Sequence, residues 1–264
     1  QYKLIIYLFI LKSKTLSSNN SLNKKMSKSI AIVEDQAEIL QNYIDLFKSQ
    51  GYEVNGYDSR ETAQSSFEKK LPDLAIIDIS LKDEVDGGFD LCRFLRSKSE
   101  TLPIIFLTAR DSDFDIVSGL RLGADDYLTK SASIHHLNAR VSALFRRVQA
   151  IHGSINHTST QAIEIDKLSL NLNQLQAFWS GKNLNLTVTE IWILYSLIKN
   201  PGNVCSRNYL MKAANTFIDQ NTITSHIKRL RNKFVIVDKD FNCIEAIYGA
   251  GYRWNISKRH EKKV

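Results

Sequence analysis

The stretch Asp73-Leu-Ala-Ile-Ile-Asp-Ile-Ser80 decides the fold of this chain. Its apolar residues 74–77 predict a strand buried on both faces, and the carboxylate of Asp78 follows at the carboxyl end of that strand. Three further runs of this kind also end in polar residues. Residues 30–33 lead into Glu34 and Asp35, residues 104–107 into Thr108, and residues 126–129 into Lys130. In an open parallel sheet the carboxyl ends of the strands share one edge, so these side chains are expected to meet there.

The first half of the chain alternates between strand and helix patterns. Strands are expected at residues 30–33, 52–57, 74–78, 104–107 and 126–128, and helices at residues 36–50, 61–69, 91–99, 114–122 and 134–147. Five strands that are each followed by a helix predict an α/β fold with a doubly wound, five-stranded parallel sheet. The chain has no glycine-rich loop of the kinds that cradle nucleotide phosphates.

The chemistry of the predicted cluster points to phosphorus. Neighbouring carboxylates repel one another unless a cation shares them, and a set of oxygen ligands suits Mg²⁺ better than zinc. Lys130 and Thr108 would add an ammonium and a hydroxyl for an anion. A carboxylate beside a metal ion and a fixed cation is a nucleophile that would form an acyl phosphate. Asp35 alone would more often be a helix cap, so the prediction depends on the co-occurrence at four strand ends.

Charge is distributed unevenly along the 264 residues. Residues 1–25 carry a net charge of +5, residues 26–150 a net charge of −5, and residues 151–264 a net charge of +7. An acidic module followed by a basic one suggests that the second module contacts nucleic acid. Three widely separated cysteines suit a reducing, cytoplasmic location without disulfides.

The expected domain organisation follows from these patterns. We expect a disordered upstream extension at residues 1–27, a first domain at 28–150, a linker at 151–161, a second domain at 162–258 and a basic tail at 259–264. The apolar run at residues 4–11 is too short to span a bilayer. The extension is therefore interpreted as translated sequence without function, and peptides from it in the native protein would contradict this.

The first domain resembles the receiver domain of two-component response regulators. The resemblance rests on Glu34-Asp35, Asp78, Thr108-Ala109 and the stretch Gly123-Ala-Asp-Asp-Tyr-Leu-Thr-Lys130. It implies that Asp78 is the phosphoacceptor and that Glu34, Asp35, Asp78 and the main-chain carbonyl of Ser80 bind Mg²⁺. It further implies that Lys130 contacts the phosphoryl group. Thr108 and Tyr127 would be the switch pair, with Tyr127 turning inward after phosphorylation.

The chain also departs from the usual receiver pattern. Ser131 follows Lys130 where the family usually has proline, and the loop at residues 81–88 is one or two residues longer than usual. Asp126 and Arg140 match an ion pair that commonly joins two receivers, whereas Ile116 and His136 depart from that dimer pattern.

The second domain is predicted to contain a DNA-binding helix. Residues 162–185 suggest a short antiparallel sheet, and Thr187 with Glu190 forms a capping box that opens a helix. In the stretch 221–234 an apolar stripe at helical spacing faces the core, while donors on the other face would contact bases and phosphates. A strand pair around residues 249–251 would form a wing. An ordinary basic surface helix is the alternative interpretation.

This half resembles the winged-helix effector domain of the OmpR/PhoB family. The matching motifs are Leu186-Thr-Val-Thr-Glu190, Asn200-Pro-Gly202, His226-Ile-x-x-Leu-Arg231 and Gly249-Ala-Gly-Tyr-Arg253. The DNA contacts that the resemblance and the helix pattern predict are Thr222, Thr224, Ser225, Lys228, Arg229, Arg231, Tyr248 and Arg253. Tyr248 replaces a wing arginine, which should weaken binding to phosphates. Residues 86–92 and 108–115 are also similar to regulators found beside proteobacterial sortase systems.

The sequence thus predicts a transcription regulator and not an enzyme. A sensor histidine kinase would phosphorylate Asp78, and a homodimer would then bind promoter DNA, with RNA polymerase as a further partner. A regulator that works without phosphorylation is the first alternative. A Mg²⁺-dependent aspartyl phosphohydrolase is the second, but such enzymes place another acid two residues after the nucleophile, where this chain has Ser80.

Overall fold

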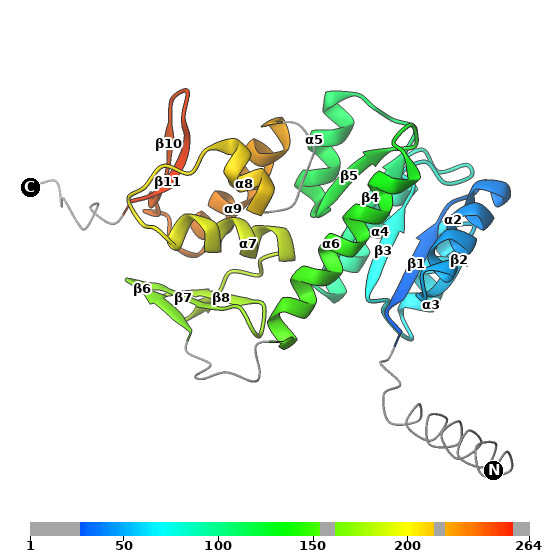
Figure 1. Cartoon of the computed structure of the whole chain (residues 1–264), viewed down its shortest axis with the longest axis horizontal. Helices are drawn as coiled ribbons and strands as arrows, with labels where there is room; N and C mark the ends of the chain where they lie inside the picture. Colours follow the sequence, from blue (N-terminus) through cyan, green and yellow to red (C-terminus); the bar gives the residue numbers. More distant parts are fainter. Residues whose placement is uncertain (1–26, 154–161, 214–219, 256–264) are drawn as a thin grey trace, which may run out of the picture.

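The computed structural model describes residues 27–153, 162–213 and 220–255, which form two domains that lie side by side (Figure 1). The upstream extension and the basic tail predicted from the sequence lie outside these residues, as does most of the predicted linker. None of the helices in the described ranges has the length and apolar character needed to cross a membrane.

The first domain is built on a five-stranded parallel sheet in the order β2-β1-β3-β4-β5. The strands are β1 (Ser29–Val33), β2 (Glu53–Tyr57), β3 (Leu74–Ile77), β4 (Ile104–Thr108) and β5 (Asp126–Thr129). The predicted doubly wound sheet is therefore confirmed. In the register, Val33 pairs with Ile77 and Ile77 pairs with Phe106, so the carboxyl ends of the three central strands lie next to one another.

Five helices cover the two faces of this sheet. They are α2 (Ala37–Ser49), α3 (Arg60–Phe67), α4 (Gly87–Lys98), α5 (Asp113–Leu122) and α6 (Ile134–Gly153). Because side chains alternate along a strand, Ala31 and Val33 face the cluster that contains residues of α3, α4 and α5. Ile30 and Ile32 face the opposite cluster, with α2 and α6. Because both faces of β1 are buried, residues 30–33 of this strand are all apolar.

Two helix boundaries of the first domain lie furthest from their predicted positions. Helix α4 begins at Gly87, four residues before the predicted start, so the loop after Asp78 is shorter than the sequence suggested. A Cβ atom at Gly88 would lie 2.1 Å from the main-chain oxygen of Asp78, so only glycine permits this close approach of helix and strand. Helix α6 continues to Gly153 and thus includes the first residues of the predicted linker.

The described residues of the second domain form an antiparallel sheet, three helices and a β-hairpin. The sheet has the order β6-β7-β8-β9, formed by β6 (Ile163–Ile165), β7 (Leu168–Asn171), β8 (Gln176–Trp179) and β9 (Lys182–Asn183). The helices are α7 (Val188–Ile198), α8 (Arg207–Ala213) and α9 (Gln220–Val237), and the hairpin is formed by β10 (Ile244–Ile247) and β11 (Gly251–Trp254). These elements match the predicted winged-helix architecture. The predicted capping box of Thr187 and Glu190 is present at the start of α7.

Candidate functional site: a carboxylate cluster and a covered basic helix

The predicted carboxylates converge at the carboxyl edge of the parallel sheet. Glu34 and Asp35 follow β1, and Asp78 follows the neighbouring strand β3. One carboxylate oxygen from each of the three residues lies within 4.8 Å of the others. Glu34 and Asp78 are buried, whereas Asp35 is partly exposed. The structure thus brings together the three acids that the sequence analysis expected to meet.

Lys130 neutralises part of this negative charge. Its Nζ lies 2.6 Å from Oδ2 of Asp78 and 2.7 Å from Oε2 of Glu34. Burial raises the pKa of Glu34, although the hydrogen bond and the charge of Lys130 act in the opposite direction. For Lys130, burial lowers the pKa of the ammonium, but its hydrogen bonds to Asp78 and Glu34 outweigh burial and raise that pKa. The cluster thus contains a cation that stays charged beside the two acids.

The donor set at this edge fits a hard divalent cation. All three groups are carboxylates, and Ser80 lies two residues beyond Asp78. Oδ1 of Asp78 is buried and has no hydrogen-bond partner among the described residues. Buried carboxylate oxygens are normally paired, so an unpaired one beside two further acids is what a metal ion or a phosphoryl group would require. Oxygen ligands of this kind suit Mg²⁺.

The two predicted switch residues lie beside the cluster. Thr108 ends β4 and is buried, and its Oγ1 accepts a hydrogen bond from the main-chain N–H of Arg110 at 3.4 Å. The hydroxyl of Tyr127 donates to the main-chain oxygen of Arg110 at 2.9 Å. Tyr127 is buried against Phe106, and burial raises the pKa of its hydroxyl. The ring of Tyr127 is thus already buried in this structure, and the role of Thr108 and Tyr127 as a switch pair stays a prediction.

Arg110 is a residue of this region that the sequence analysis missed. Its Nη1 lies 3.0 Å from Asp86 and 3.3 Å from Asp115, and its Nη2 donates to the main-chain oxygen of Val85. On the other side of the same loop, the main-chain N–H of Lys82 donates to Oδ2 of Asp35 at 2.9 Å. The loop after Asp78 is thus tied to both neighbouring loops. No spacing in the sequence joins residue 110 to residues 85 and 86, so these contacts depend on the fold.

The predicted DNA contacts divide into exposed and buried residues. Thr224 and Lys228 on α9 are exposed, and Tyr248 is fully exposed in the turn between β10 and β11. Arg231 is half-buried and donates to the main-chain oxygen of Ile244 at 2.8 Å, and Arg253 pairs with Glu245 at 2.8 Å. In contrast, Thr222, Ser225 and Arg229 are buried. In this arrangement these three cannot reach a DNA groove, contrary to the outward-facing positions expected from the helix pattern.

Arg229 is buried because α9 packs against α5 of the first domain (Figure 1). Its Nε pairs with Oε1 of Glu190 at 2.5 Å, its Nη2 donates to Oγ1 of Thr187 at 3.1 Å, and its Nη1 donates to the main-chain oxygen of Leu120. The guanidinium therefore joins α9 both to the start of α7 and to the end of α5. Arg229, which the sequence predicted as a DNA contact, thus makes a contact between the two domains that its sequence pattern does not indicate.

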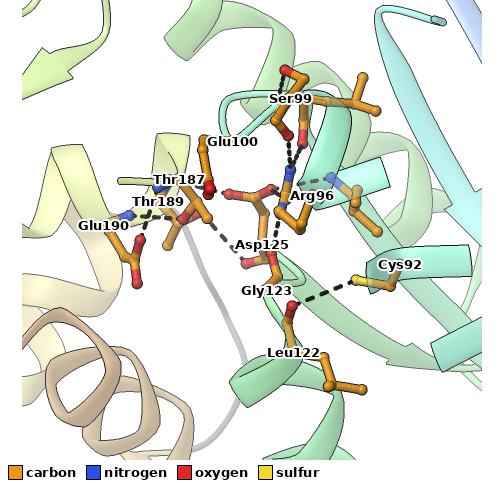
Figure 2. A network of polar contacts seen from close by, with 12 residues as sticks. Cys92, Arg96, Ser99, Glu100, Leu122, Gly123, Asp125, Thr187, Thr189 and Glu190 are labelled. Carbon is orange, nitrogen blue, oxygen red and sulfur yellow. Dashed lines mark hydrogen bonds and ion pairs between the residues drawn. The ribbon is translucent and has the colours of Figure 1, made fainter. Parts of the chain in front are cut away.

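A second contact between the domains is centred on Asp125, just before β5 (Figure 2). Its Oδ2 pairs with Nη2 of Arg96 at 2.8 Å and accepts from the main-chain N–H of Ile104 at 3.1 Å. Its Oδ1 accepts from the main-chain N–H of Thr189, in the first turn of α7, at 3.1 Å. Arg147 of α6 donates to the hydroxyl of the same Thr189 at 3.2 Å. Asp125 thus connects the receiver core with the second domain.

The predicted dimer-face pair is formed within one chain. Oδ2 of Asp126 lies 3.5 Å from Nε of Arg140, and both side chains are buried. Burial raises the pKa of Asp126 to about 6, although Arg140 acts in the opposite direction. The expected pairing of these residues across two subunits is therefore not their arrangement in this structure.

Comparisons with known proteins support the predicted identity of both domains. The family model described as response regulator receiver domain matches residues 30–142, and the model described as transcriptional regulatory protein, C terminal, matches residues 181–254. The chain is 34% identical over 230 residues to the transcriptional regulatory protein CreB of Escherichia coli (strain K12), which covers 85% of this chain and 96% of CreB. It is 36% identical over 233 residues to the regulatory protein VanR of Enterococcus faecium, which covers 86% of this chain and 99% of VanR.

A solved structure supports the fold of both domains. A cysteine-to-serine mutant of RitR superposes with a TM-score of 0.66 at 22% sequence identity, over 86% of this chain and 99% of that chain. The sequence relatives are transcription regulators, and the two family models appear in the order that the sequence predicted. This chain therefore belongs to the OmpR/PhoB family of two-component response regulators, in which a receiver domain controls a winged-helix DNA-binding domain.

Proposed function

We propose that Asp78 is the phosphoacceptor of this regulator and that a sensor histidine kinase supplies the phosphoryl group. The observation that carries the proposal is the buried, unpaired Oδ1 of Asp78 beside two further carboxylates and the ammonium of Lys130. An oxygen of Asp78 attacks the phosphorus of the kinase phosphohistidine. The phosphorus–nitrogen bond breaks, its electron pair stays on the imidazole nitrogen, and Asp78 becomes an acyl phosphate.

The other residues of the site position this reaction. Glu34, Asp35, Asp78 and the carbonyl of Ser80 would hold Mg²⁺, which when bound offsets the charge of the phosphoryl oxygens. Lys130 moves from its ion pairs with the carboxylates to the phosphoryl group. The hydroxyl of Thr108 donates to a phosphoryl oxygen, which removes it from the N–H of Arg110.

The second domain is proposed to bind promoter DNA through α9 and the hairpin of β10 and β11. Thr224, Lys228 and Tyr248 are already exposed in the structure and would make the first contacts. Thr222, Ser225, Arg229, Arg231 and Arg253 would complete the surface once α9 is free of the receiver. We further propose that the regulator forms a homodimer through Asp126 and Arg140. It would work in the cytoplasm and contact RNA polymerase at the promoter. The likeness to regulators beside sortase systems and the domain boundaries remain predictions.

Labelling with radioactive acetyl phosphate tests the phosphoacceptor directly. The wild-type chain with Mg²⁺ should incorporate label that is labile in base, as an acyl phosphate is. Asp78→Asn should abolish this incorporation, because an amide cannot attack phosphorus. Asp83→Asn is the matched control, since Asp83 is an exposed acid in the adjacent loop and should label normally.

Two results would speak against this proposal. Label that persists in Asp78→Asn would place the nucleophile elsewhere, and a wild-type chain that never labels would favour a regulator that works without phosphorylation.

Removal of Mg²⁺ with a chelator should abolish labelling of the wild type as well, because three carboxylates then lack the shared cation.

A further inference from the structure

The three carboxylates at the edge of the parallel sheet are not held in the same way. Glu34 and Asp78 are buried, and both pair with the ammonium of Lys130. Asp35 is partly exposed, and its Oδ2 accepts a hydrogen bond from the main-chain N–H of Lys82 at 2.9 Å. The orientation of this third acid therefore depends on the loop that follows β3.

That loop forms a closed turn at residues 81–84. The main-chain N–H of Leu81 donates to the main-chain oxygen of Glu84 at 3.0 Å, and the N–H of Glu84 donates to the oxygen of Leu81 at 2.9 Å. The side chain of Leu81 is buried in the core, which anchors the start of the turn. Lys82 has a φ of 50°, in the left-handed region that residues other than glycine rarely adopt. Because this conformation costs free energy, contacts around the turn have to hold it in place.

Two ion pairs attach this turn to the region where α3 begins. Nη2 of Arg60 donates to Oε1 of Glu84 at 3.0 Å while Nε donates to Oε2, so the pair is bidentate. Nζ of Lys82 lies 3.0 Å from Oδ2 of Asp58. The four side chains are 34–55% exposed, so salt can screen both pairs. A single exposed pair contributes little, but bidentate geometry and two pairs on one short turn are the conditions under which such contacts matter.

We propose that the turn at residues 81–84 is a positioning element for the metal site. The N–H of Lys82 orients the carboxylate of Asp35. The ion pairs to Asp58 and Arg60 hold the turn and thereby set the affinity of the site for Mg²⁺. This role rests on the metal site of the proposed function. An exposed carboxylate that is free to rotate loses that freedom when it ligates a metal ion, whereas a fixed one does not. Partners that orient metal ligands typically change metal affinity by about 10- to 100-fold.

The double substitution Arg60→Gln/Glu84→Gln in the full-length chain tests this role, because it removes one ion pair without changing the net charge. Mn²⁺, which also takes oxygen ligands, serves as the probe, and electron paramagnetic resonance measures the free ion during a titration. Asp35→Asn removes a proposed ligand and so identifies the site. The charge reversal Arg60→Glu/Glu84→Arg restores the pair. Asp90→Asn/Arg93→Gln is the matched control, since it removes an exposed ion pair that joins two residues of α4 and not the turn.

Arg60→Gln/Glu84→Gln should bind Mn²⁺ at least about fivefold more weakly than the wild type, because loosening the turn frees Asp35. The charge reversal and the α4 control should bind within about twofold of the wild type. The difference between the wild type and Arg60→Gln/Glu84→Gln should shrink at about 1 M salt, where screening removes the pair. Wild-type affinity in Arg60→Gln/Glu84→Gln, or equal weakening by the α4 control, would overturn the role of the turn. Binding that survives Asp35→Asn at the wild-type affinity would instead refute the proposed metal site.

Hydrogen exchange reports on the turn without any metal ion. The amide hydrogen of Lys82 should exchange slowly in the wild type, because Asp35 accepts it. Arg60→Gln/Glu84→Gln should accelerate this exchange, while the amide of Gly88 at the start of α4 stays protected by its own main-chain acceptor. Unchanged exchange at Lys82 in this variant would show that the ion pair does not hold the turn, and the proposed role would fail.

Discussion

At the scale of single residues, Glu190 shows how a position typical of a helix cap acquires a second role. Its Oε2 accepts from the N–H of Thr187 in the capping box, while Oε1 pairs with Arg229 and Lys233 lies 2.9 Å away. Burial raises the pKa of Glu190, but the charges of Arg229 and Lys233 outweigh burial and lower it to about 2. This carboxylate therefore stays ionised inside the protein.

The lowered pKa of Glu190 predicts how stability depends on pH. A carboxyl whose pKa falls on folding stabilises the protein above its unfolded value of about 4.5, and this contribution is lost as pH falls toward 2. Glu190→Gln should therefore lower the free energy of unfolding at pH 7 by on the order of 3 kcal/mol. The difference from the wild type should shrink between pH 4.5 and 2, as measured by urea unfolding followed through the fluorescence of the second domain's tryptophans.

Glu68→Gln serves as the control for this measurement, since Glu68 is an exposed acid of the receiver. It should leave both the stability at pH 7 and its pH dependence nearly unchanged. A constant difference between Glu190→Gln and the wild type from pH 7 to pH 2 would show that the charge of Glu190 does not stabilise the fold.

At the scale of secondary-structure elements, the start of α4 fixes the main chain around Asp78. Gly88 donates its N–H to the main-chain oxygen of Ile79 at 2.8 Å, and a Cβ at Gly88 would lie 2.1 Å from the main-chain oxygen of Asp78. At Gly88 the helix therefore contacts the strand end through main-chain atoms. Such atoms cannot move aside by changing a rotamer.

Gly88→Ala should consequently displace α4 from the proposed phosphorylation site. We expect a loss of about 2 kcal/mol or more in the free energy of unfolding, the usual cost of overpacking, together with slower labelling by acetyl phosphate. Gly87→Ala is the matched neighbour, because its Cβ would chiefly meet the side chain of Glu84 and not the main chain. It should cost less and label nearly as fast, and equal effects of the two substitutions would refute the role of the close contact.

The elements also show what the sequence could predict. The central strands were predictable because β3 and its neighbours are apolar runs of the right length, and the carboxylates were predictable because each follows such a strand. The start of α4 was not, because two consecutive glycines at residues 87 and 88 look like a loop until their packing against Asp78 is known. The contacts of Arg110 and Asp125 join residues far apart in sequence, so no local pattern could have indicated them.

At the scale of the whole molecule, one side of the receiver carries both the contact with the second domain and the proposed dimer residue Asp126. The helix α5 that contacts α9 lies next to β5, which carries the proposed dimer residue Asp126 (Figure 1). In the function proposed above, phosphorylation of the receiver and DNA binding by the second domain are coupled. Each of the two ligands then changes the affinity of the other site by the same factor.

Linkage requires a reciprocal effect that is measurable without any substitution. If beryllofluoride, which mimics the phosphoryl group, tightens binding of a DNA duplex by some factor, a saturating concentration of the duplex should tighten binding of beryllofluoride by the same factor. Couplings of this type are typically about 5- to 150-fold. Titration of beryllofluoride with and without duplex measures it, with Lys228→Ala, which should lose duplex affinity, as the control. Identical beryllofluoride affinities in both titrations would show that the two domains do not communicate.

The acceptor that Arg229 uses in the receiver is a main-chain oxygen, that of Leu120. A main-chain carbonyl is supplied by whichever amino acid occupies the position, so mutation of residue 120 does not delete it. Over evolutionary time such a contact persists through changes that would erase a pairing of two side chains, and it leaves no correlated substitutions by which an alignment would reveal it. A chain that keeps the arginine and the same backbone path would therefore form this contact with any amino acid at residue 120.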